Sequence, residues 1–371
     1  MTAPSHTPPV STTVEAFVRD VIRDDIRALA AYHVQASAGM VKLDAMENPY
    51  ALPEPLREEL GSLLSGAALN RYPDPQAGDL KSAIRGAMRI PADMALLLGN
   101  GSDEIIQMLA MAVARPGAVV LGVEPSFVMF SMIARFLGLE YAGVPLRSDF
   151  SIDETAVMEV VRTRRPALAF FAYPNNPTGN LFDAAVLGRI IAASPGLVVV
   201  DEAYTAFADE SFLGGIGRHP NLVVMRTLSK LGLAGLRLGM LIGHPAWLAE
   251  IDKVRLPYNV NVLTQHAAAR VLRNPEVLAE QTESIRTERT RLSAALATLP
   301  GTHVFPSAAN FVTIRLADAT GTFARLRERG ILVKNLDRAH PLLSGCLRLT
   351  VGTPDENDRL LAALGDILKL R

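Results

Sequence analysis

Short apolar runs that alternate with helical patterns dominate the middle of this chain. Nearly every residue within a run is apolar, whereas the segments between runs carry apolar residues at helical spacing. The runs are Val119–Val123, Ala167–Tyr173, Leu197–Val200, Leu222–Met225 and Gly239–Ile242, and the helical patterns include Asp103–Ala114, Phe127–Leu137 and Ala184–Ala193. Strands that are apolar on both sides must be covered on both faces, which is typical of parallel sheets in α/β proteins. The pattern predicts a large, mostly parallel sheet with helices on both faces and ligands at the carboxyl ends of its strands.

The pattern changes after about residue 265. Pro275–Leu299 and Asp355–Leu370 predict long helices, with a shorter helix at Thr322–Arg329. Strand-like pieces at His303–Phe305, Phe311–Arg315 and Leu347–Val351 lie between them. Because 371 residues exceed what one core usually supports, we expect a large α/β domain over 51–270 and a smaller α+β domain over 271–371. Residues 1–50 would form an N-terminal arm that joins the small domain or a dimer. Within it, Val14–Ala31 carries apolar residues at helical spacing and predicts an amphipathic arm, and 1–13 would be a disordered tip.

Composition excludes several classes of protein. The formal net charge is −1, so the chain lacks the basic surface that nucleic acids and anionic membranes require. No stretch is long and apolar enough for a transmembrane helix, and the N-terminus has no secretory signal pattern. A single cysteine, Cys346, allows no intramolecular disulfide, and the seven histidines show no metal-ligand spacing. We therefore expect a cytoplasmic protein without a metal site.

Polar residues of particular kinds follow the predicted strands. The segment "GNGSDE", residues 99–104, combines glycines with Ser102 and Asp103 at a predicted helix start, which suits an anion or an ordinary helix cap. Asp201 comes directly after a buried strand, where a carboxylate needs a cation or a strong donor. Lys230 lies in "TLSKLGLAGLRLG", an apolar turn with no acid nearby in sequence, where burial would lower its pKa and leave a neutral amine.

One cofactor accounts for these residues together. Pyridoxal 5′-phosphate needs a lysine for an imine, an aspartate for its ring nitrogen, and an anion site for its phosphate. Lys230 and Asp201 would supply the first two, and Arg237 with the hydroxyls of Ser102, Thr227 and Ser229 would hold the phosphate. The same reasoning explains Arg237, whose negative partner would be the ligand.

At this point the sequence resembles the fold-type I aminotransferases. The segments "YPNNPTG", "DEAY" and "SK…LR" occur in that family's order, and the resemblance runs from about Leu43 to the end of the chain. Within the family, "RYPDPQ", "GNGSDE", "SAANF" and "LRLTVGTPDEN" resemble histidinol-phosphate aminotransferases.

The resemblance implies a role for each matching cofactor residue. Lys230 would carry the cofactor and shuttle the proton, and Asp201 would face the pyridine nitrogen. Asn176 and Tyr204 would bond the ring oxygen O3′, and Phe127 would stack on the ring. Gly101, Ser102 and Asp103 would line the phosphate site with Thr227, Ser229 and Arg237.

The resemblance also implies a substrate and a partner. Tyr72 would reach the cofactor phosphate of a neighbouring subunit, so the active unit would be a homodimer. Arg348 would hold the acidic group of the substrate, with Asn48 and Lys334 as further substrate residues. One guanidinium can accept either the phosphate of histidinol phosphate or the carboxylate of 2-oxoglutarate. The implied reaction yields imidazole-acetol phosphate and glutamate in histidine biosynthesis.

Three departures from the family pattern leave alternatives open. Met46 stands where many relatives have asparagine, the spacing from Lys230 to Arg237 is one residue short, and Lys334 replaces an expected arginine. An aromatic amino-acid aminotransferase is the nearest alternative. A decarboxylase of a phosphorylated amino acid and a cofactor-binding protein without catalysis are others.

Overall fold

A computed structural model describes residues 13–31 and 35–369 of the chain. Contacts divide it into two units, Met1–Ala36 and Ser37–Arg371. In the first unit, helix α1 spans Val14–Val21 and helix α2 spans Asp24–Arg27. The helical spacing noted over Val14–Ala31 thus corresponds to two helices, because the extended backbone at Ile22 and Arg23 separates them. The disordered tip was predicted for residues that lie, except Thr13, outside the described part of the chain.

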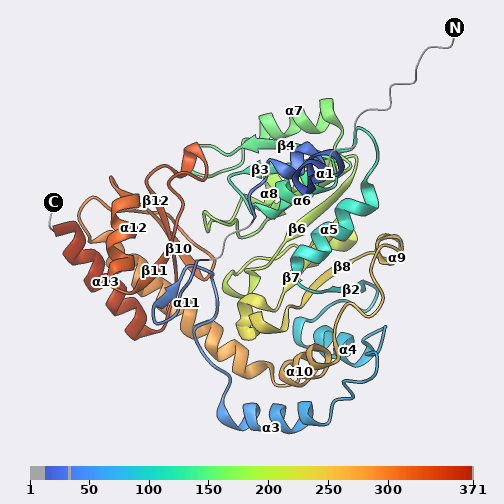
Figure 1. The fold of residues 1–371 in the computed structure, drawn as a ribbon, viewed down its shortest axis with the longest axis horizontal. Coiled ribbons are helices and arrows are strands. Elements are labelled where there is room, and N and C mark those ends of the chain that lie inside the picture. Colours follow the sequence, from blue (N-terminus) through green and yellow to red (C-terminus); the bar gives the residue numbers. More distant parts are fainter. Residues whose placement is uncertain (1–12, 32–34, 370–371) are drawn as a thin grey trace. The chain divides into compact units, whose positions relative to one another are not determined.

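A seven-stranded sheet organises the larger unit (Figure 1). Its strand order is β2-β8-β7-β6-β5-β3-β4, and all strands run in one direction except β8, which is antiparallel to both neighbours. The strands are β2 (Ala95–Gly99), β3 (Val119–Glu124), β4 (Glu140–Pro145), β5 (Leu168–Ala172), β6 (Leu197–Asp201), β7 (Leu222–Thr227) and β8 (Gly239–Gly243). The expected mostly parallel sheet is confirmed.

Helices cover both faces of this sheet, as fully apolar strands require. Alternate residues of each strand enter different cores: Val199 joins one with Ile105 and Phe130, and Val200 joins the other with Leu187. The helices of this part are α3 (Glu54–Ser65), α4 (Gly78–Met88), α5 (Ser102–Val113), α6 (Met129–Phe136), α7 (Glu154–Arg164), α8 (Ala184–Ala193), α9 (Pro245–Asp252) and α10 (Val262–Leu272).

A second sheet has five strands in the order β1-β11-β12-β10-β9. Strand β1 (Val41–Leu43) pairs with β11 (Ile331–Asn335), so a segment near the N-terminus completes the sheet of the C-terminal third. The other strands are β9 (His303–Val304), β10 (Phe311–Arg315) and β12 (Cys346–Thr350), and the helices are α11 (Pro275–Ala297), α12 (Ala319–Glu328) and α13 (Pro354–Lys369). This sheet and its helices bury a separate core that includes Leu292, Phe311, Leu349 and Leu364. The division at residue 270 stays a prediction.

Short 3₁₀ helices and one π-helix, η3, complete the described part of the larger unit. They are η1 (Thr205–Phe207), η2 (Leu213–Arg218), η3 (Ser229–Leu233), η4 (Ala234–Leu236) and η5 (Pro341–Leu343). Among the residues that the structure describes, no helix is long and apolar enough to cross a membrane.

Candidate active site

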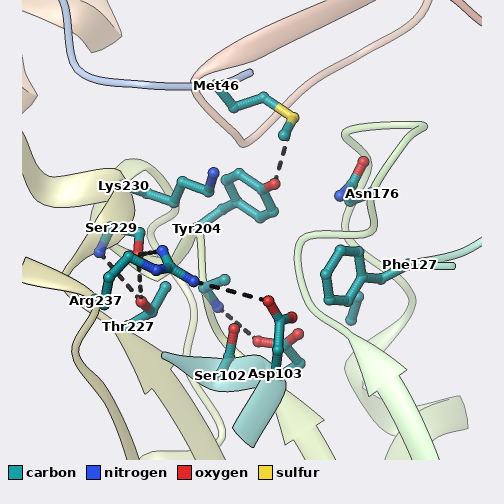
Figure 2. A pocket seen from close by; sticks show the side chains of 13 residues that line it. Met46, Ser102, Asp103, Phe127, Asn176, Tyr204, Thr227, Ser229, Lys230 and Arg237 are labelled. Atoms are coloured by element: carbon teal, nitrogen blue, oxygen red, sulfur yellow. Dashed lines mark hydrogen bonds and ion pairs between the residues drawn. The ribbon is translucent and has the colours of Figure 1, made fainter. Parts of the chain in front are cut away.

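One pocket lies where the strands of the large sheet end (Figure 2). Strands β2, β3, β5, β6 and β7 point the same way, so the segments that follow them converge at one edge. Ten residues predicted from the sequence line the pocket: Ser102, Asp103, Phe127, Asn176, Asp201, Tyr204, Thr227, Ser229, Lys230 and Arg237. Met46, Ala172 and Ala203 complete the lining.

Lys230 lies in a one-turn π-helix, η3, directly after β7. Gly232 makes this turn possible because its φ of +108° lies in a region that side chains disfavour. The lysine Nζ donates a hydrogen bond to the carbonyl oxygen of Ala45 at 3.1 Å. Burial, aided by the positive charge of Arg348, lowers the pKa of Lys230 to about 8. The predicted neutral amine is therefore accessible near physiological pH.

A candidate anion site lies at the start of α5. Gly101 is the N-cap and offers no side chain, so the first N–H groups of α5 keep their donor capacity for a ligand. Ser102, Thr227, Ser229 and Arg237 surround the same end of the pocket, at the lower left of Figure 2. A side chain at Gly101 would meet an Arg237 nitrogen at 2.8 Å, so the loop and the guanidinium lie in close contact.

Asp103 supplies the acid that Arg237 lacks in sequence. Its Oδ2 lies 3.8 Å from Nη2 of Arg237, although the two residues are far apart along the chain. Burial raises the pKa of Asp103 above its usual value, and the positive charge of Arg237 opposes this shift. A distant segment thus supplies the acid that is missing from the sequence around Arg237, and the expected pairing of Arg237 with a ligand stays a prediction.

Asp201 and Tyr204 come from the end of β6. Asp201 is 4% exposed and accepts one hydrogen bond from the N–H of Ala203 at 3.1 Å. Burial raises the pKa of Asp201 to about 7. A positively charged group bound beside Asp201 would lower this pKa again and keep the side chain ionised. Burial also raises the pKa of Tyr204, which keeps the hydroxyl protonated as a donor.

Met46 joins the pocket from a distant segment. The Tyr204 hydroxyl donates to its Sδ at 3.4 Å. Its backbone has a left-handed φ of 54° and is held by Thr350, which accepts from the Met46 N–H, and by Asn310, which donates to the Met46 carbonyl. The only sequence signal for Met46 was its departure from the family pattern.

Phe127 and Asn176 lie on the side of the pocket opposite Lys230 and Arg237 (Figure 2). The ring of Phe127 meets Phe130 edge-on, with centroids 5.5 Å apart, which limits the orientations that Phe127 can take. The Oδ1 of Asn176 accepts a hydrogen bond from Nη1 of Arg348 at 2.5 Å. Arg348 is 7% exposed and also donates to the carbonyl of Asp44, so it lies directly behind the pocket wall.

Five predicted residues lie outside the pocket lining: Gly101 and Arg348, described above, and Lys334, Asn48 and Tyr72. Lys334 is paired with Arg348 across β11 and β12, so both side chains start from the same face of the smaller sheet. Asn48 donates to the carbonyl of Leu231 and to Gln281 rather than facing the pocket. Tyr72 is 80% exposed, and its ring stacks on Tyr258 with centroids 4.4 Å apart. Their predicted roles with substrate and partner stay predictions.

Comparison with known proteins places this site in a family. The model of class I and II aminotransferases matches residues 38–364. The chain belongs to this family. It is 52% identical over 366 residues to histidinol-phosphate aminotransferase 1 of Ralstonia nicotianae, which covers 97% of this chain and 98% of that protein. It is 54% identical over 347 residues to the histidinol-phosphate aminotransferase of Chromobacterium violaceum, and this match covers 94% of this chain and 98% of that protein.

A solved structure of a family member has the same fold. The histidinol-phosphate aminotransferase from Sinorhizobium meliloti, crystallised in complex with pyridoxal-5′-phosphate, superposes with a TM-score of 0.80 at 25% identity. The match covers 94% of this chain and 98% of that one. The resemblance drawn from the motifs, and the enzyme class that it implied, are confirmed.

Proposed function

We propose that this protein is a pyridoxal 5′-phosphate-dependent histidinol-phosphate aminotransferase. It moves the amino group of L-histidinol phosphate to 2-oxoglutarate, giving imidazole-acetol phosphate and L-glutamate, as a step of histidine biosynthesis. The observation that carries the proposal is the meeting of a low-pKa lysine, a buried aspartate and an anion site in one pocket. Relatives more than 50% identical over nearly the whole chain carry this enzyme name.

The residues of the pocket fit the cofactor. The start of α5, three hydroxyls and Arg237 provide donors for a phosphate, and the absence of a side chain at Gly101 lets a ligand approach the backbone. Phe127 offers an aromatic face, and Asp201 offers an anion for a ring nitrogen. When bound, pyridoxal phosphate supplies an aldehyde that accepts the amino group and a ring that withdraws electrons from the substrate Cα.

Lys230 and its neighbours would handle the proton. The amine of Lys230 is neutral above about pH 8 and can then take a proton from the substrate Cα. The Ala45 carbonyl orients Nζ, and the ring of Tyr204 lies 5.9 Å from it. Tyr204, kept protonated by burial, and Asn176 can donate hydrogen bonds to a ring oxygen.

Arg348 would bind the acidic group of both substrates. Its guanidinium reaches the pocket wall through Asn176, so a substrate phosphate or carboxylate could take over this contact. Lys334 starts beside it on the same sheet face and can add a second positive charge. Asn48, which holds the carbonyl of Leu231, is proposed to contact substrate only at the edge of the site.

We also propose a cytoplasmic homodimer. Tyr72 and Tyr258 form a stacked, exposed pair, and Leu256 in the loop beside Tyr258 is 70% exposed. A second copy would cover these apolar side chains, and Tyr72 could then enter the phosphate site of that copy.

Steady-state turnover tests the proposed function. Purified enzyme is mixed with histidinol phosphate and 2-oxoglutarate, and glutamate formation is followed for the wild type, Arg348→Lys and Lys230→Ala. We expect Lys230→Ala to lose turnover, and Arg348→Lys to raise the KM for both substrates by about tenfold, because an ammonium lacks the paired donors of a guanidinium. A wild type that turns over phenylalanine faster than histidinol phosphate would instead support the aromatic aminotransferase.

A further inference from the structure

The loop that leads into the candidate anion site is held by hydrogen bonds to side chains that do not line the pocket. It connects Gly99, the last residue of β2, with Ser102, the first residue of α5. Gly101 has a φ of +88°, and its N–H donates to the carbonyl of Gly99 at 2.9 Å, which makes a very tight turn. A glycine turn of this kind loses much conformational entropy when ordered, so it needs external contacts to stay in one shape.

Glu104 provides the first of these contacts. It is the third residue of α5, and its Oε2 accepts the backbone N–H of Asn100 at 2.5 Å. This contact resembles a capping box, in which the third helical residue turns back to a backbone N–H before the helix. Asn100 is thereby held, and the N–H groups of Ser102 and Asp103 are left for the pocket.

Asn259 provides the second contact. Its Nδ2 donates to the same Oε2 of Glu104 at 2.7 Å and to the carbonyl of Leu98 at 3.2 Å. Its Oδ1 accepts from Nη1 of Arg255 at 3.2 Å, and Nε of Arg255 donates to Asp252 at 2.6 Å. Both ends of the loop, strand β2 and helix α5, are therefore tied to one amide on a separate segment.

We propose that Glu104 and Asn259 are positioning residues for the cofactor phosphate. Neither residue lines the pocket, so neither touches the phosphate; they act by holding the backbone that does. This inference rests on the proposed function, since it requires a phosphate-bearing cofactor in the pocket. The charge of Glu104 is not itself useful, because a carboxylate near a helix N-terminus repels a bound phosphate. Its value is as an acceptor for two N–H groups, and glutamine keeps an acceptor oxygen.

The test compares two cofactor forms on four proteins. Pyridoxal phosphate and pyridoxal, which has the same aldehyde and ring but no phosphate, are titrated by absorbance into the wild type, Glu104→Ala, Glu104→Gln and Asn259→Ala. Glu104→Ala removes the acceptor of both N–H groups. We expect it to weaken the binding of pyridoxal phosphate by about tenfold and to leave the binding of pyridoxal within about twofold of the wild type. Glu104→Gln should restore the wild-type affinity, and Asn259→Ala should weaken pyridoxal phosphate selectively but less.

A matched control comes from another helix. Glu356 is the third residue of α13, and its Oε2 accepts the N–H of Thr353 at 2.9 Å, so Glu356→Ala removes a similar cap far from the pocket in sequence. This variant should bind both cofactor forms as the wild type does. Equal weakening of both forms by Glu104→Ala, or no weakening of either, would overturn the inference while leaving the proposed function intact. A wild type that binds neither form would overturn the proposed function and this inference with it.

Discussion

At the scale of single residues, the chemistry depends on the environment of one amine. Lys230 lies in an apolar turn where burial and the charge of Arg348 disfavour its ammonium form. The pKa falls from the ordinary lysine value to about 8, so the amine is neutral above that pH and charged below it. Only the neutral amine attacks an aldehyde.

The pH dependence of cofactor capture checks this environment. The rate at which the cofactor-free protein captures pyridoxal should rise about tenfold per pH unit below pH 8, because the neutral fraction of Lys230 grows in that proportion. Above about pH 8 the rate should level off. Stopped-flow absorbance measures it directly. A rate that keeps rising to pH 10, as for an exposed lysine, would contradict the buried state of the amine.

The residues that follow strands could be predicted from the sequence, and those that approach from elsewhere could not. Lys230, Asp201 and Asn176 were predicted because each follows an apolar run. Parallel strands end at the same edge of a sheet, so the residues after them meet there. Met46 and the contact between Asp103 and Arg237 were missed, because these neighbours are far apart in sequence. Periodicity carries no information on such pairings.

At the scale of elements, a buried ion pair joins the ends of β6 and β7. The carboxylate of Glu202 has no exposed surface, and its Oε2 accepts from Nε and Nη2 of Arg226 at 2.9 and 2.7 Å. The same carboxylate accepts hydrogen bonds from Ser211 and from the N–H of Phe212. This network fastens the strand ends that carry Asp201 and Lys230.

Removing the acid should destabilise the protein strongly. Glu202→Ala leaves the guanidinium of Arg226 without its buried partner, which costs roughly 3 kcal/mol in free energy of unfolding. Urea unfolding followed by circular dichroism measures the change. Glu250→Ala removes an exposed ion pair with Lys253 and should have no measurable effect. Similar stabilities for Glu202→Ala and Glu250→Ala would show that the buried network contributes little.

The elements themselves were predicted unevenly. Strands of the large sheet and helix α8 follow the apolar patterns closely, because fully buried strands leave an unmistakable signature. Strand β4 has a mixed pattern because it is an edge strand with partly exposed residues. The antiparallel direction of β8 could not be predicted, since an apolar run reads the same in either direction.

At the scale of the whole molecule, the exposed apolar side chains predict self-association. The ring of Tyr72 stacks on Tyr258, and Leu256 lies two residues before Tyr258 in the chain. A charge placed among these exposed side chains should weaken the binding of a second copy of the chain. Analytical ultracentrifugation at micromolar concentration should find a dimer for the wild type and a larger monomer fraction for Leu256→Glu. A monomeric wild type would contradict the homodimer and the role of Tyr72 across it.

The half-reaction with one amino donor at a time tests the central claim most directly. The absorbance of the bound cofactor is followed as histidinol phosphate, phenylalanine or glutamate is added to separate samples of the purified protein. We predict that histidinol phosphate converts the cofactor to its amine form with a much larger apparent specificity constant than phenylalanine, since its phosphate offers Arg348 and Lys334 more negative charge than the carboxylate of phenylalanine does. A larger constant for phenylalanine would contradict the substrate, and conversion by none of the three donors would contradict the aminotransferase reaction itself.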